Sequence, residues 1–223
     1  MRQQKGKKIL IYLSVFLIIC SINNTSLNRM QIEKIKNIKI SGLSENENIN
    51  LLENIMDLKL ENIFFLKGNE VSKIISSNSL VQNYKIFKKY PHTLDIEIEK
   101  TDFLAKINNN GKMSLIGSNG KLSDIKFSDR DLPFIFGKPD IEEFIKFTNV
   151  IKQSKFSLDQ VKNLYFFPSK RWDLKLKSNI ILKLSKDHTK LSLDQAFEIL
   201  NDNNFNDIKV VDARIKNQII LND

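Results

Sequence analysis

Residues 81–99, VQNYKIFKKYPHTLDIEIE, decide the fold of the N-terminal half of the chain. Val81 to Lys89 is a strand-like run, and Pro91 ends it because proline cannot donate a backbone hydrogen bond to a sheet. In Leu94-Asp95-Ile96-Glu97-Ile98-Glu99, apolar and acidic residues then alternate strictly, as in a strand with one buried and one solvated face. The stretch therefore predicts two consecutive strands, and its carboxylates indicate a solvated sheet face.

The residues before this stretch predict one more strand and two helices. Ile38 and Ile40 alternate with polar residues and Gly42 ends the run, which favours a short strand. Ser44 and Glu47 have the spacing of a capping box at a helix start, and Asn69 is placed to cap a second helix. The order strand, helix, helix, strand, strand predicts a small domain over residues 36–102, with both helices on one face of the sheet.

The residues after it predict a second domain over residues 103–223. Strands at 103–107 and 113–116 flank Asn108-Asn109-Asn110-Gly111, and Asn119-Gly120 predicts a further hairpin. Further elements are expected as follows: an apolar patch at 132–137, a helix capped by Asp140, strands at 161–167, 172–176 and 180–184, a helix with a capping box at Ser192–Gln195, and strands at 208–215 and 218–221. Several strands with two helices predict a mixed, mostly antiparallel sheet, so the whole chain is expected to be α+β.

The N-terminus predicts export. Lysines at 5, 7 and 8 precede the apolar run 9–22, and positive charge before such a run keeps the N-terminus in the cytoplasm. The run suits a cleaved signal peptide or an uncleaved anchor, and the absence of a small-x-small pair after it favours the anchor. We therefore expect a cytoplasmic tail over 1–8, a transmembrane anchor in lipid over 9–28, a stalk over 29–35 and a periplasmic bulk.

The composition argues against several functional classes. The net charge is +9, but the lysines are spread along the chain, so no nucleic-acid partner is expected. Cys20 is the only cysteine and cannot form an intramolecular disulfide. His92 and His188 have no metal-like spacing, and no nucleophile elbow occurs, so no metal, no cofactor and no enzymatic activity are expected.

Two features of the C-terminal half suggest binding. Trp172, the only tryptophan, follows Lys170 and Arg171; it is either a core aromatic or the rim of a binding surface. The last predicted strand runs almost to Asp223 with no later element to cover it. An uncovered edge strand invites pairing with a partner strand, so strand addition is the expected use, and internal pairing on both sides is the alternative.

Several motifs, taken in order, resemble the FtsQ/DivIB family of bacterial cell division proteins, which carry a POTRA domain followed by a β domain. The matching segments cover nearly the whole chain: Ile38-Lys39-Ile40-Ser41-Gly42, Tyr84 to Pro91 with Thr93 to Glu99, Phe103-Leu104-Ala105, Leu115 to Leu122, Leu132-Pro133-Phe134-Ile135-Phe136-Gly137, Lys170 to Leu174, and Val211-Asp212-Ala213-Arg214. The chain departs from the pattern at Phe103, where a proline is usual, and at Gln218, where a glycine is usual, so the last turn is expected to have another geometry.

The resemblance implies a non-catalytic scaffold of the divisome, at the septum in the cell inner membrane. It implies binding of FtsB and FtsL, with a strand of FtsB added to the last strand of the β domain, and contacts of the POTRA domain with other divisome proteins. The implied contact residues are Lys170, Arg171, Trp172, Ile215, Asn217, Gln218, Ile219 and Ile220. Two alternatives stay open: another POTRA-containing factor of export or envelope assembly, and an exported enzyme whose site is not recognised.

Overall fold

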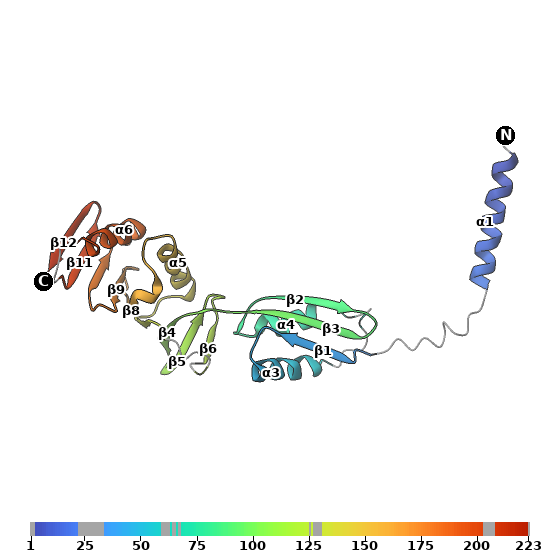
Figure 1. The fold of residues 1–223 in the computed structure, drawn as a ribbon, viewed down its shortest axis with the longest axis horizontal. Helices are drawn as coiled ribbons and strands as arrows, with labels where there is room; N and C mark the ends of the chain where they lie inside the picture. Colours follow the sequence, from blue (N-terminus) through green and yellow to red (C-terminus); the bar gives the residue numbers. More distant parts are fainter. Residues whose placement is uncertain are drawn as a thin grey trace.

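A computed structural model describes residues 3–21, 34–58, 63, 66, 68–124, 126, 131–202 and 208–222. Its helices are α1 (Gln3–Ser21), α3 (Glu45–Met56), α4 (Gly68–Ser77), α5 (Ile141–Lys152) and α6 (Thr189–Leu200), with a 3₁₀ turn, η2, at Leu158–Gln160. Its strands are β1 (Asn37–Ser41), β2 (Val81–Lys89), β3 (Thr93–Lys100), β4 (Phe103–Asn109), β5 (Lys112–Gly117), β6 (Leu122–Asp124), β7 (Phe134–Phe136), β8 (Val161–Phe166), β9 (Trp172–Leu176), β10 (Ile181–Leu184), β11 (Val210–Ile215) and β12 (Gln218–Asn222). They form two sheets that lie end to end (Figure 1).

The smaller sheet has the predicted β-α-α-β-β order. Its strands lie in the order β1-β3-β2, with β1 parallel and β2 antiparallel to the central β3. Helices α3 and α4 cover one face, and their buried residues Leu51, Ile55, Val71 and Ile75 pack against Leu94, Ile96 and Ile98 of β3. The apolar positions of the strict alternation thus form this core, as expected.

Gly42, which follows β1, is required by close backbone packing. Its φ is 103°, and a Cβ at this position would lie 1.8 Å from the carbonyl oxygen of Ile98. Glu47 accepts a hydrogen bond from the backbone N–H of Ser44 at 2.9 Å, as the capping box predicted. The prediction for Asn69 is wrong: α4 begins at Gly68, so Asn69 lies inside the helix.

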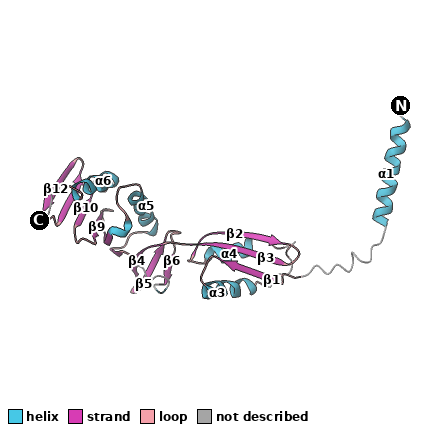
Figure 2. Ribbon diagram, viewed as in Figure 1, coloured by secondary structure: helices cyan, strands magenta, loops and turns pink. Residues whose placement is uncertain are grey.

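The larger sheet has nine strands in the order β12-β11-β10-β9-β8-β7-β4-β5-β6. Five of its pairings are antiparallel, and the parallel ones are β4 with β7, β7 with β8, and β10 with β11. The expectation of a mixed, mostly antiparallel sheet is confirmed. Helices α5 and α6 lie on one side of this sheet (Figure 2). They supply Phe144, Phe147, Ile151, Leu193 and Ala196 to its core.

The start of α6 differs from the prediction. The helix begins at Thr189 with His188 as its N-terminal cap residue, so Ser192 lies within the helix and is not a cap. Its buried hydroxyl donates to the carbonyl of Ala213 at 2.7 Å and accepts from the N–H of Ser185 at 3.2 Å. Buried polar groups are normally hydrogen-bonded, and here the hydroxyl ties α6 to β11.

The N-terminal helix α1 exposes its apolar residues from Ile9 to Ile19. Among the helices in the described part of the chain, none combines the length and the apolar character needed to cross a membrane. The predicted transmembrane anchor is therefore not supported: α1 has 19 residues, and these include Lys5, Lys7 and Lys8. Residues 22–28 of that anchor, and 29–33 of the stalk, lie outside the described residues.

The hairpin between β5 and β6 fastens the two sheets together. The side-chain amide of Asn119 donates to the carbonyls of Ser79 and Val81, both at 2.9 Å, and its oxygen accepts from the N–H of Lys121 at 3.0 Å. The ammonium group of Lys121 donates in turn to the carbonyl of Asn78 at 3.2 Å. The partners at 78, 79 and 81 precede or begin β2, so a turn of the larger sheet is bonded to the smaller one.

Further contacts surround that turn. The hydroxyl of Thr101 lies 3.2 Å from both the side-chain oxygen of Gln82 and the hydroxyl of Ser118, and Ser118 donates to Gln82 at 2.8 Å. Leu80, Phe103 and Leu115 form a small separate apolar cluster. The junction therefore combines a polar network with its own buried apolar contact.

Candidate partner-binding edge of the larger sheet

Strand β12 forms one outer edge of the nine-stranded sheet. It pairs with β11 alone, in antiparallel register, with Val211 opposite Leu221 and Asp212 opposite Ile220. Ile219 and Leu221 pack against the core, while Gln218 and Ile220 are exposed. The sequence left open whether the last strand is an uncovered edge or is paired on both sides. Within the described residues it is an uncovered edge.

The turn before β12 accounts for the departure at Gln218. Ile215 pairs with Gln218 across a two-residue turn, and Asn217 takes the left-handed conformation with a φ of 58°. Asparagine tolerates this conformation better than other non-glycine residues. The register shifts between Asp212 and Ile215, so the strand pairing is irregular near the end of the hairpin.

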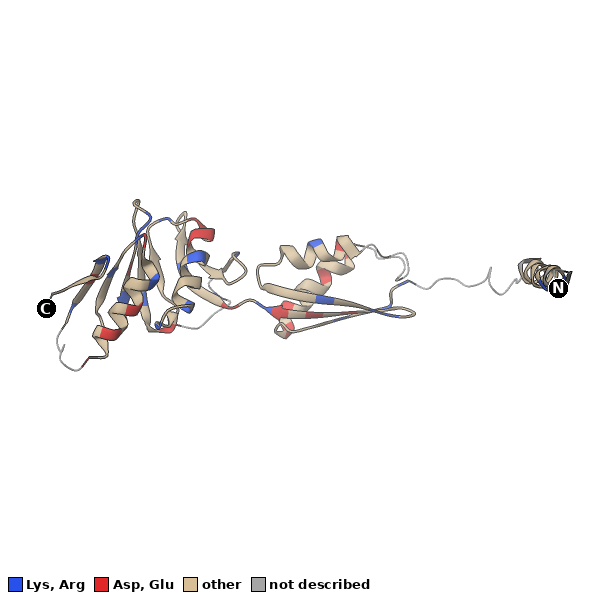
Figure 3. Cartoon of the chain, turned by 90° about the horizontal axis from the view of Figure 1, so that it is seen from above, with Lys and Arg blue, Asp and Glu red and all other residues tan. Residues whose placement is uncertain are grey.

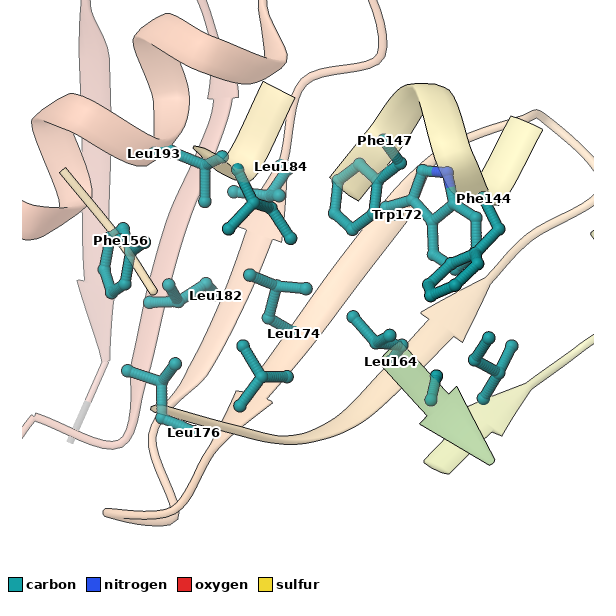
Figure 4. Packing of buried hydrophobic residues seen from close by; sticks show 14 of the residues in the cluster. Phe144, Phe147, Phe156, Leu164, Trp172, Leu174, Leu176, Leu182, Leu184 and Leu193 are labelled. Atoms are coloured by element: carbon teal, nitrogen blue, oxygen red, sulfur yellow. The ribbon is translucent and has the colours of Figure 1, made fainter. Parts of the chain in front are cut away.

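Strand β11 holds the edge in place. Val211 and Ala213 are fully buried, and the hydroxyl of Ser192 bonds to the Ala213 carbonyl. Trp172, much further into the sheet, is 7% exposed and stacks on Phe147 with ring centroids 4.6 Å apart (Figure 4). Phe166 lies 4.8 Å from the same indole. Trp172 is thus a core aromatic, the simpler of its two interpretations.

Lys170 and Arg171 lie away from this edge, in the turn between β8 and β9, with β10 and β11 between β9 and β12. Lys170 pairs with Glu143 of α5 at 2.9 Å; hydrogen bonding to that carboxylate raises the pKa of Lys170, and the same bond lowers the pKa of Glu143. Arg171 donates to both carboxylate oxygens of Asp173, at 3.1 and 3.3 Å, and lies 4.4 Å from the ring of Phe167. Both cations already have partners within the chain.

Arg214 is a charged residue at this edge that the sequence analysis did not select. Its guanidinium donates to both carboxylate oxygens of Asp212, with Nε at 2.8 and 3.0 Å. The bonds from Arg214 lower the pKa of Asp212 below its usual range and raise that of the guanidinium. Residues two apart on a strand share a face, so the Asp-x-Arg spacing in Val211 to Arg214 was the available signal.

Within the described residues no group of three or more histidine, cysteine, aspartate or glutamate side chains is placed to hold a metal ion. Lysine and arginine are distributed over both parts of the molecule (Figure 3). That the chain is not an enzyme stays a prediction, as does the absence of a cofactor or of a nucleic-acid partner.

A three-stranded sheet with two covering helices, followed by a mixed sheet with a free last strand, defines a protein of the POTRA-plus-β-domain class. The model of the "POTRA domain, FtsQ-type" matches residues 33–100, and that of "Cell division protein FtsQ/DivIB, C-terminal" matches residues 105–214. The chain belongs to the FtsQ/DivIB family of bacterial cell division proteins.

Individual relatives carry the same names. Cell division protein FtsQ of Rickettsia typhi is 24% identical over 207 residues, which cover 84% of this chain and 72% of that protein. Cell division protein DivIB of Clostridium acetobutylicum is 30% identical over 92 residues, covering 41% of this chain and 37% of the relative. The major extracytoplasmic domain of DivIB from Geobacillus stearothermophilus has 16% identity, covers 47% of this chain and 97% of its own, and has a TM-score of 0.34, too low to bear on the fold.

Proposed function

We propose that this chain is a divisome scaffold that binds FtsB and FtsL by accepting a strand of FtsB on the free side of β12. One observation carries the proposal: among the described strands, β12 is an outer one that pairs with β11 alone. An unpaired strand edge offers a row of backbone donors and acceptors, which a partner strand satisfies as the sheet extends. The predicted domains, 36–102 and 103–223, would then separate two tasks, with FtsB bound at the far end of the second.

The side chains of this edge support the same partner geometry. Ile220 is 44% and Ile215 is 54% exposed, so each offers apolar surface beside the unpaired backbone. Asn217 lies in the turn before the strand, Gln218 begins the strand, and Ile219 anchors it to the core. Arg214 is half-exposed next to this strand, but its guanidinium is paired with Asp212, so an acidic residue of the partner has to compete with that pair as well.

Lys170 and Arg171 remain proposed partner contacts of a different kind. Their charges are balanced by Glu143 and Asp173, so a partner carboxylate has to compete with those bonds. We therefore assign them a smaller share of the binding energy than the β12 backbone, and Trp172 a supporting share through the core beneath them.

We also propose that the chain acts at the division septum of the inner membrane, with its bulk on the periplasmic side. The support is the basic N-terminus followed by the exposed apolar residues of α1. Cell fractionation, and protease treatment of spheroplasts, test this. The proposal requires the chain in the membrane fraction and digestion of the bulk only after the outer membrane is opened.

The binding test compares two variants of the full chain in detergent. Ile220→Asp places a charge on the exposed face of β12, whereas Ile49→Asp makes the same change on α3, where Ile49 is 46% exposed. A pull-down with FtsB and FtsL should lose at least about nine-tenths of the bound partner for Ile220→Asp, because a charge at a pairing edge opposes strand addition. Ile49→Asp should bind as the unchanged chain does; equal retention by both variants would refute strand addition at β12.

A further inference from the structure

The smaller sheet has a free edge of its own, on the outer side of β1. In the order β1-β3-β2, no strand of the described chain lies beyond β1. The N–H of Asn37 donates inward to the carbonyl of His92 at 3.3 Å. Because peptide groups alternate sides along a strand, the N–H and C=O groups of Ile38 and Ile40 are directed outward, where another strand could pair with them.

A hollow runs beside this edge. It has a volume of about 610 Å³ and is lined by residues 34–39 together with Leu52 and Met56 of α3. Met56 is 61% exposed, and Leu52 and Ile38 are half-buried, so apolar surface lies open between the strand and the helix. A methionine at such a place adapts to differently shaped apolar side chains.

The charged residues among the described lining of the hollow are all basic. Lys34, Lys36 and Lys39 all line the hollow, and α3 contributes only apolar residues to it. Lys34 and Lys39 make no ion pair with other residues of the described chain. An occupant with carboxylates would therefore gain attraction from these two ammonium groups without breaking an existing pair.

We propose that the β1 edge binds an extended peptide segment of a partner protein, one in which apolar residues alternate with acidic ones. The segment pairs with the outward peptide groups of Ile38 and Ile40 and so becomes a fourth strand of the sheet. Its apolar side chains enter the hollow against Leu52 and Met56, and its carboxylates meet Lys34 and Lys39. This surface lies in the other sheet from β12 and is independent of FtsB binding.

A labelled synthetic peptide of alternating valine and glutamate tests the proposal on the full chain in detergent. Fluorescence anisotropy should show saturable binding to the unchanged chain. The double variant Lys34→Glu with Lys39→Glu should bind this peptide at least about tenfold more weakly. It should prefer a second labelled peptide in which lysine replaces every glutamate, because the sign of the rim charge is reversed. The same peptide with N-methyl groups on alternate residues should not bind, since it cannot form the backbone ladder.

Cross-linking locates the peptide. In a Cys20→Ser background, Met56→Cys should form a disulfide with a peptide that carries cysteine at an apolar position. Lys85→Cys, on the opposite edge strand β2, is the matched control and should not react. Preferred reaction at Lys85→Cys, unchanged affinity of the Lys34/Lys39 variant, or equal binding of the N-methylated peptide would each overturn the proposal.

Vesicles of phosphatidylglycerol test whether an anionic lipid surface, which lysines also attract, occupies this site instead of a peptide. Vesicle binding that is lost in the Lys34/Lys39 variant, with no binding of the valine–glutamate peptide, would assign the surface to lipid and refute the peptide proposal. If the Lys34/Lys39 variant self-associates and still binds the peptide as strongly, the lysines serve only to prevent pairing of β1 edges between copies of the chain. That result would also refute the peptide proposal.

Discussion

The two Asn-Gly turns of the larger sheet have the same sequence signal and different roles. Asn110-Gly111 closes the β4–β5 hairpin in solvent, and both residues have positive φ, 50° and 88°. Asn119-Gly120 closes the β5–β6 hairpin, but the Asn119 side chain is bonded to two carbonyls of the smaller sheet. The dipeptide specifies a tight turn in both cases. Whether the turn also links the two sheets depends on whether the smaller sheet lies within hydrogen-bonding distance.

Among substitutions in and around the two turns, replacing Asn119 should lower the free energy of unfolding most. Asn119→Ala removes three hydrogen bonds and leaves the carbonyls of Ser79 and Val81 without these donors, so we expect a loss of about 3 kcal/mol in the free energy of unfolding. Urea unfolding measures it. Asn110→Ala is the matched control, and a loss for it as large as that for Asn119→Ala would remove the distinction between the turns.

Gly117→Ala should come next. The added Cβ would lie 2.6 Å from the side-chain oxygen of Asn119 and 2.8 Å from the hydroxyl of Thr101, so both members of the network have to move. Overpacking of this kind costs about 2 kcal/mol. Thermal unfolding measures the loss, and a stability equal to that of the unchanged chain would show that the network tolerates displacement.

The two glycines of the turns should respond alike. Gly120 and Gly111 have φ values of 73° and 88°, and neither would place a Cβ closer than 3.9 Å to another group. Each change to alanine should therefore cost about 1 kcal/mol, from the backbone conformation alone. Calorimetry of the two variants measures both losses of stability. A much larger loss for Gly120→Ala would show that Gly120 also contributes to the junction between the sheets.

The smallest effect is expected at Asn108. Its side-chain oxygen accepts from the N–H of Gly111 at 2.8 Å in an exposed position, where water replaces a lost bond. Asn108→Ala should cost about 0.5 kcal/mol. Urea unfolding with a precision of a few tenths of a kcal/mol distinguishes this value from zero, and a loss of several kcal/mol would contradict the solvent-exposed character of the first turn.

Local patterns predicted most of the elements, because the information lies within a few residues. The alternation at 94–99 gave β3, and both Asn-Gly turns lie where expected. Ser192 shows the limit: its spacing to Gln195 imitates a cap, whereas its buried hydroxyl is held by Ala213, a partner far along the chain. No local pattern indicates such a partner.

The position of the candidate site could be predicted from the sequence better than the contacts of its residues. The pattern near the C-terminus predicts a last strand that is either an uncovered edge or paired on both sides, and among the described strands β12 lies at the edge. The partners of Lys170 and Arg171 do not follow, because Glu143 belongs to α5 and because the distance of the β8–β9 turn from β12 depends on strand order. Strand order is set by long-range pairing, which a single sequence does not display.

The polar junction around Asn119 has a mechanical consequence. β3 ends at Lys100 and β4 begins at Phe103, so the covalent connection between the two sheets has almost no slack. The bonds from Asn119 and Lys121 act alongside this short connector as braces. A force applied to one sheet is therefore transmitted to the other sheet, because no flexible linker lies between them.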